Sequence, residues 1–359
     1  MKFNFKLANI RTSYIFFFFL ALLKIYFSTG NVHAKNFDIN NVEISTPFEI
    51  SFKKEEIIDK GFIAAFDRLM SSIVKSDDKE LVSQIPLNNI KSMINTFSIK
   101  QEKFINEIYY VSLDVSFNKK KIFKLLESKN IFPSLPNKKK IFFIPIIINE
   151  NKDELLLFSE SLIFKNWNND NKEHYLLEYI LPTSDLDDLN LIKSNYDLIE
   201  NYDFNEIINK YALKNFIIAI IFNKESEIRV LSKINFNKGL IINNQIYQNI
   251  DLADKDSILK LTNKLKISYE DYWKTNNQIN TSIKLPLTIA INSKDNSIIS
   301  KFEESLFDLD LVYNFYIQKF DNKNIYYKII FNGSPDIFLK TMKEKNYDFN
   351  TQNQTWTLK

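Results

Sequence analysis

Three carboxylates lie close together in the segment Leu181-Pro182-Thr183-Ser184-Asp185-Leu186-Asp187-Asp188-Leu189. Asp185, Asp187 and Asp188 could together hold a hard cation such as calcium, which prefers oxygen ligands. The pattern does not match an EF-hand loop, because the central glycine is absent and Tyr196 stands where the bidentate acid would be. The alternative, which the sequence favours, is a helix start that Ser184 would cap, with the acids near the positive end of the helix dipole.

The remaining polar residues exclude several familiar chemistries. The chain has no cysteine, so a thiol nucleophile and a thiolate zinc site are excluded. Phosphate-binding loops need closely spaced glycines, and Gly30, Gly61, Gly239 and Gly333 lie far apart. His174 is the one histidine beyond residue 34, and we expect it at the surface, where a strand begins. The sequence therefore assigns no catalytic residue and no cofactor, and it favours a protein that is not an enzyme.

Residues 1–34 are typical of a secretory signal peptide. Three basic residues precede an apolar run at residues 14–23, and Val32-His33-Ala34 is a small-x-small motif that predicts cleavage after Ala34. The alternative is a retained anchor at residues 14–27, although this run is shorter than the ~20 apolar residues of a membrane span. We therefore expect a periplasmic or otherwise exported protein without a later membrane span, with anchoring in the inner membrane as the alternative.

The composition fits a folded protein from an AT-rich bacterium. Apolar residues make up 45% and charged residues 25% of the 359 residues, which are ordinary values for a globular chain. Removal of the signal changes 47 basic and 44 acidic residues to 43 and 44, so the mature chain is nearly neutral. Nucleic-acid binding depends on phosphate neutralisation, and we expect none. An exported protein of a eukaryotic parasite is disfavoured, because secreted eukaryotic domains often rely on disulfides.

The first predicted domain, residues 35–137, is an α/β unit. Residues 107–117 alternate apolar and polar side chains, which is the period of a half-buried strand. Asn118 would cap the helix that follows. The other predictions in this domain are an extended segment (41–52), a helix (55–74) and a short helix (88–97).

The second predicted domain, residues 138–278, is a mixed α/β unit. Apolar runs at 141–148 and 216–222 predict strands that are covered on both faces. The segments 227–236 and 240–250 predict an antiparallel pair. The other predictions in this domain are a strand (175–181) and three helices (154–167, 203–213 and 256–273).

The third predicted domain, residues 279–359, has the βαββαβ order of a ferredoxin-like fold. Its strands are expected at 285–291, 311–320, 324–331 and 355–358, and its helices at 296–309 and 335–345. The predicted fold class is therefore α+β or mixed α/β, with two or three small sandwich modules. Trp167, Trp273 and Trp356 all fall within predicted elements, and we expect them to anchor the cores.

Three stretches of the chain carry a resemblance to a known family. They are Gly61-Phe62-Ile63-Ala64-Ala65-Phe66-Asp67-Arg68-Leu69, then Tyr110 to Phe117 leading into Ile122-Phe123-Lys124-Leu125-Leu126, and Leu181 to Asp188, which is similar to a Leu-Pro-x-x-Asp-Leu-x-Asp stretch. Over roughly residues 37–250 the chain resembles the exported proteobacterial family catalogued as domain of unknown function 2066. The resemblance implies an envelope location and an α/β fold, and it supplies no activity, ligand or catalytic residue.

An exported chain of small α/β modules without a catalytic motif predicts a non-catalytic cell-envelope protein that contacts another envelope protein. The alternative is a ligand-binding or metal-binding protein, or a hydrolase, with a site near Asp185–Asp188. An exposed sheet edge or apolar patch would favour the first function, and one concave polar pocket would favour the second.

Overall fold

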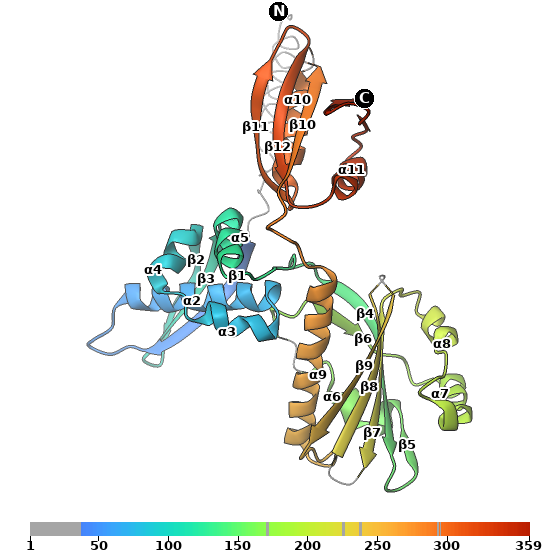
Figure 1. Cartoon of the computed structure of the whole chain (residues 1–359). Coiled ribbons are helices and arrows are strands. Elements are labelled where there is room, and N and C mark those ends of the chain that lie inside the picture. The colour runs from blue at the N-terminus through green and yellow to red at the C-terminus, as the bar shows by residue number, and fades with distance from the viewer. Residues whose placement is uncertain (1–36, 170–171, 225–226, 237–238, 293, 295) are drawn as a thin grey trace, which may run out of the picture. The chain divides into compact units, whose positions relative to one another are not determined.

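The computed structural model describes residues 37–359, except 170–171, 225–226, 237–238, 293 and 295 (Figure 1). The predicted signal peptide and its cleavage site at Ala34 lie outside the described residues. The described chain contains three sheets with interspersed helices, which confirms the predicted α+β class. Its apolar side chains form one core at the first sheet, one on each face of the second sheet, and one at the third.

The first sheet is antiparallel and has the strand order β1 (Phe37–Pro47), β3 (Ile108–Phe117), β2 (Ile94–Ile105). Alternate residues of β3 are buried, as the pattern predicts. Helix α2 (Lys54–Ile73) packs on the sheet, and a Cβ at Gly61 would collide with the side chain of Leu113 on β3. The absence of a side chain at Gly61 therefore allows the close approach of helix and sheet.

The sequence prediction of a helix over 88–97 is correct only for its first part. Helix α4 (Leu87–Met93) is followed at once by β2, which pairs with β3 along its whole length. This strand pairing overrides local helix propensity from Ile94 onward. Asn106 and Glu107 then have positive φ angles of 50° and 60°, as in a two-residue type I′ hairpin turn. Two short helices complete the region: α3 (Lys79–Ser83) and α5 (Lys119–Ser128), which Asn118 caps as predicted.

The second sheet has the strand order β5-β4-β7-β8-β9, with β6 also paired to β4. The strands are β4 (Lys139–Asn149), β5 (Glu154–Leu156), β6 (Leu177–Ile180), β7 (Phe216–Lys224), β8 (Glu227–Asn235) and β9 (Leu240–Gln248). Strands β4 and β7 are parallel neighbours and are buried on both faces, as their apolar runs predict. Helices α6 (Leu162–Asn166) and α9 (Lys255–Asn276) cover one face, and α7 (Leu186–Ser194) and α8 (Asn205–Lys210) cover the other (Figure 1).

The prediction of one helix over 154–167 is wrong. Residues 154–156 form strand β5, because they pair with the end of β4. Helix α6 begins only at Leu162, where the side chain of Ser161 caps it by accepting a hydrogen bond from the N–H of Phe164. Only five residues of the predicted helix are therefore α-helical.

The third sheet has the order β11-β12-β10-β14-β13. Its elements are β10 (Leu285–Asn292), α10 (Asn296–Asp308), β11 (Val312–Phe320), β12 (Asn324–Phe331), α11 (Pro335–Glu344), β13 (Phe349–Asn350) and β14 (Thr355–Leu358). The element order β10-α10-β11-β12-α11 is as predicted. The rest of the ferredoxin-like prediction is wrong, because the short strand β13 precedes β14 and β14 runs parallel to β10, whereas a ferredoxin-like sheet is antiparallel throughout. Trp167 and Trp273 are buried in the second region, and Trp356 packs against the third core, as expected of core anchors.

Candidate functional site

The predicted metal ligands Asp185, Asp187 and Asp188 form the start of helix α7. Asp185 is the capping residue, since its carboxylate accepts a hydrogen bond from the N–H of Asp187 at 2.9 Å. The prediction of a helix start is confirmed, and the prediction that Ser184 caps it is wrong because the helix begins one residue later.

A lysine stands between two of these carboxylates. Lys210 Nζ lies 2.5 Å from Asp188 Oδ1 and 3.6 Å from Asp185 Oδ2, and the Asp188 residue is fully buried. The hydrogen bond to Asp188 raises the pKa of Lys210. The ammonium group therefore occupies the place between the carboxylates that a cation would need. In the part of the chain that the structure describes, no three His, Asp or Glu side chains are arranged to hold a metal ion.

His174 is half-buried rather than at the surface. Burial, followed by the charges of Lys274, Lys79 and Lys172, lowers its pKa to about 4. The imidazole is therefore uncharged at neutral pH.

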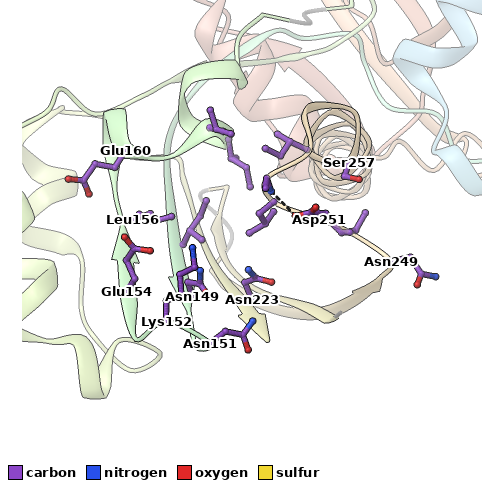
Figure 2. Close-up of a pocket in the computed structure, with 17 residues that line it drawn as sticks. Asn149, Asn151, Lys152, Glu154, Leu156, Glu160, Asn223, Asn249, Asp251 and Ser257 are labelled. Atoms are coloured by element: carbon purple, nitrogen blue, oxygen red, sulfur yellow. Dashed lines mark hydrogen bonds between the residues drawn. The ribbon is translucent and has the colours of Figure 1, made fainter. Parts of the chain in front are cut away.

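A cavity of about 640 Å³ lies where the parallel strands β4 and β7 end. Asn149 and Asn223 are partners in the strand register at this point, and both line the cavity. The carboxyl ends of parallel strands are a common place for ligand sites in α/β sheets. Figure 2 shows Asn151 and Lys152 near these two asparagines, Glu154 on β5, and Asp251 and Ser257 near the start of α9.

The cavity is lined by amide, carboxylate, ammonium and hydroxyl groups that can form hydrogen bonds. Asn149 Oδ1 is buried and has no hydrogen-bond partner among the described residues. The carboxylate of Asp251 accepts a hydrogen bond from the N–H of Ala253 at 2.8 Å. Ser257 supplies the one hydroxyl among the described lining residues, and these residues include no histidine. Sequence reasoning missed this site, although its signal was present, since each asparagine directly follows an all-apolar strand segment.

A second feature is an exposed group of apolar side chains at one end of the first sheet, here called the apolar tip: Phe48, Ile50, Phe104 and Ile105. They are 50%, 109%, 58% and 49% exposed. The N–H of Phe48 donates to the carbonyl of Glu107 at 2.7 Å, and the rings of Phe48 and Phe104 meet edge to face at 4.9 Å. The loop after β1 and the β2–β3 hairpin thus form the tip together (Figure 1). Sequence reasoning did not single out these residues.

Fold and surfaces together define a small α+β protein with a polar cavity and an apolar tip. Among the residues that the structure describes, none of the helices is long and apolar enough to cross a membrane. No protein-family model matches the sequence. The chain is 27% identical, over 278 residues, to a Clostridium botulinum protein named non-toxic nonhemagglutinin type E. The alignment covers 73% of this chain and 21% of that protein, so the chain spans about a fifth of the length of this relative.

Proposed function

We propose that this chain is a non-catalytic accessory protein of the cell envelope that binds another envelope protein through the apolar tip. The observation that carries the proposal is the exposure of four large apolar side chains at one place, including the completely exposed Ile50. Exposed contiguous apolar surface on a soluble domain commonly marks an interaction site.

The surroundings of the tip resemble the polar rim of a protein interface. Lys54 pairs with Glu102 at 2.8 Å, and the hydroxyl of Tyr109 donates to the same carboxylate at 2.6 Å. These two hydrogen bonds lower the pKa of Glu102. A fixed, charged rim around an apolar centre is the usual anatomy of a protein–protein contact.

The envelope location is supported by the signal-like residues 1–34 and by the resemblance to an exported family. The botulinum relative is named as a protein that is neither toxic nor a hemagglutinin, and such a name is compatible with an accessory role. Cell fractionation and N-terminal sequencing test the location: the mature protein should be periplasmic and begin at Lys35. A cytoplasmic protein that begins at Met1 would contradict it.

Capture from the envelope tests the binding function. The tagged chain, crosslinked in its own cells, should recover one envelope protein, and Ile50→Ser with Phe104→Ser should reduce that recovery at least tenfold. Leu198→Ser is the matched control, because Leu198 is 67% exposed and lies far along the chain on the second region. The proposal would be contradicted if the unaltered chain, the double variant and the control variant recovered the envelope protein equally. Recovery of the tagged chain without any second protein would also contradict it.

The cavity at the ends of β4 and β7 favours a second candidate function, binding of a small ligand with N–H or O–H donors. The unpaired Oδ1 of Asn149 is the specific observation. Native mass spectrometry of the protein purified from its own cells should show a small adduct that Asn149→Leu loses. A single bare mass for both proteins would rule this candidate out.

A further inference from the structure

One sheet edge in the described chain lacks the features that usually protect open edges. Unpaired strands are normally kept from pairing with other chains by charges, bulges or short length. The other outer strands have such features. Strands β1 and β2 carry charged residues and register shifts, and β11 carries Lys319 and register shifts. Strand β6 has four residues that include Glu178, and β5 and β13 are only three and two residues long.

Strand β9 is different from all of these. Its nine residues, Leu240 to Gln248, include no charged side chain, and its pairing with β8 has no register shift. Leu240, Ile242 and Ile246 project from one face and are 55%, 64% and 58% exposed. Asn244 is exposed on the same face, and Ile241, Asn243, Gln245 and Tyr247 on the opposite face are half-buried.

The sequence of β9 is nearly symmetric about its middle residue, Asn244. Ile242 and Ile246 are placed equally on either side, and Asn243 mirrors Gln245. If two copies pair antiparallel about a two-fold axis at Asn244, each isoleucine lies opposite the partner's other isoleucine, and the amides lie opposite amides. A symmetric dimer interface must be self-complementary in this way.

The neighbouring charges do not oppose such a pairing. Arg229 and Lys233 of β8 lie opposite Ile246 and Ile242 in the strand register. Arg229 is paired with Glu200 at 2.6 Å, and Lys233 Nζ donates to the carbonyl of Tyr202 at 2.9 Å. Both cations therefore already have partners within the chain.

We infer that two copies of this chain dimerise through antiparallel pairing of β9 with β9, with Asn244 opposite Asn244 of the second copy. The dimer continues the second sheet from one copy into the next. It does not use the apolar tip, so it stands independently of the proposed partner.

The absence of cysteine makes a direct test simple, because any introduced cysteine is the only thiol. Under mild oxidation the exported protein with Asn244→Cys should form a disulfide-linked dimer in high yield. Gln101→Cys, at an exposed position on edge strand β2, is the control and should crosslink at least tenfold less. Similar yields from the two variants would overturn the inference.

Sedimentation gives a second readout that does not depend on crosslinking. The unaltered protein should sediment as a dimer at micromolar concentration. Asn244→Lys alone and Asn244→Asp alone should each be monomeric, because like charges then face each other across the axis. An equimolar mixture should restore the dimer, because opposite charges face each other. If the unaltered protein sediments as a monomer, the inference is overturned. The same holds if the monomer binds a different protein at β9.

Discussion

Glu270 and Lys274 lie one turn apart on helix α9, and each is buried against main-chain groups of a different segment. The carboxylate of Glu270 accepts a hydrogen bond from the N–H of Leu177 at 2.8 Å, where β6 begins. Lys274 Nζ donates to the carbonyl of Val74 at 2.9 Å, directly after α2. Burial raises the pKa of Glu270 and lowers that of Lys274. Helix α9 therefore fastens two segments that are distant in the sequence.

Replacement of Lys274 should destabilise the fold strongly. Lys274→Met leaves the carbonyls of Ser71 and Val74 without their buried donor. A buried unpaired polar group costs about 1–3 kcal/mol, so we expect the free energy of unfolding to fall by about 2–4 kcal/mol. Urea denaturation measures this change. Lys260→Met, at an exposed position of the same helix, should stay within about 0.5 kcal/mol of the unaltered protein. Equal effects of the two changes would show that the buried contacts of Lys274 contribute nothing.

His174 should make the fold less stable in mild acid. Its pKa is lowered from 6.5 to about 4, mainly by burial, so the unfolded chain takes up this proton at a higher pH than the folded chain. The free energy of unfolding should therefore fall as the pH drops from 6.5 to 4, by roughly 2–3 kcal/mol, and this contribution should not change further below pH 4.

The variant His174→Gln isolates this contribution. Glu270 has a raised pKa and acts in the opposite direction in acid, so the difference between the unaltered protein and the variant is the informative quantity. Urea midpoints at several pH values should show a smaller loss of stability in the variant between pH 6.5 and 4. Parallel curves for the two proteins would refute the assignment.

Gly61 should not tolerate a side chain while Leu113 is present. A Cβ at Gly61 meets Leu113 Cδ1, so Gly61→Ala should cost about 1–3 kcal/mol from overpacking, against a gain of up to about 1 kcal/mol in helix propensity. Leu113→Val removes the opposing methyl group. The free energy of unfolding of the double variant should therefore exceed, by about 1 kcal/mol, the value expected from adding the effects of the two single changes. A double-mutant cycle measured by thermal or urea denaturation gives this difference. Simple additivity would contradict the contact.

Calcium should not bind at the start of α7. Lys210 Nζ already contacts both Asp185 and Asp188, so a cation would have to displace it. We expect no binding heat when calcium is titrated into the protein in a calorimeter. A signal with a stoichiometry near one that Asp185→Asn abolishes would reverse this interpretation and restore the acidic cluster as a metal site.

The elements whose patterns are local could be predicted from the sequence. The alternation in β3 and the element order β10-α10-β11-β12-α11 follow from patterns within a few residues, and the structure confirms both. The parallel pairing of β14 with β10 could not be predicted in this way, because it depends on contacts between distant parts of the chain. Strand β2 could not be predicted, because its conformation depends on pairing with β3. Asn149 and Asn223 meet only because β4 and β7 are parallel neighbours. The exposure of Ile50 could not be predicted, because apolar residues are common throughout the sequence and the residue type alone does not show which of them are exposed.

The most direct test of partner binding places a photo-crosslinking amino acid at position 50 of the chain in living cells, with position 198 as the control. Both native residues are exposed, and only Ile50 belongs to the apolar tip. Light should produce one discrete crosslinked product from position 50 that contains a second envelope protein, and none from position 198. The absence of a product at position 50, or the same products from both positions, would contradict the proposed function.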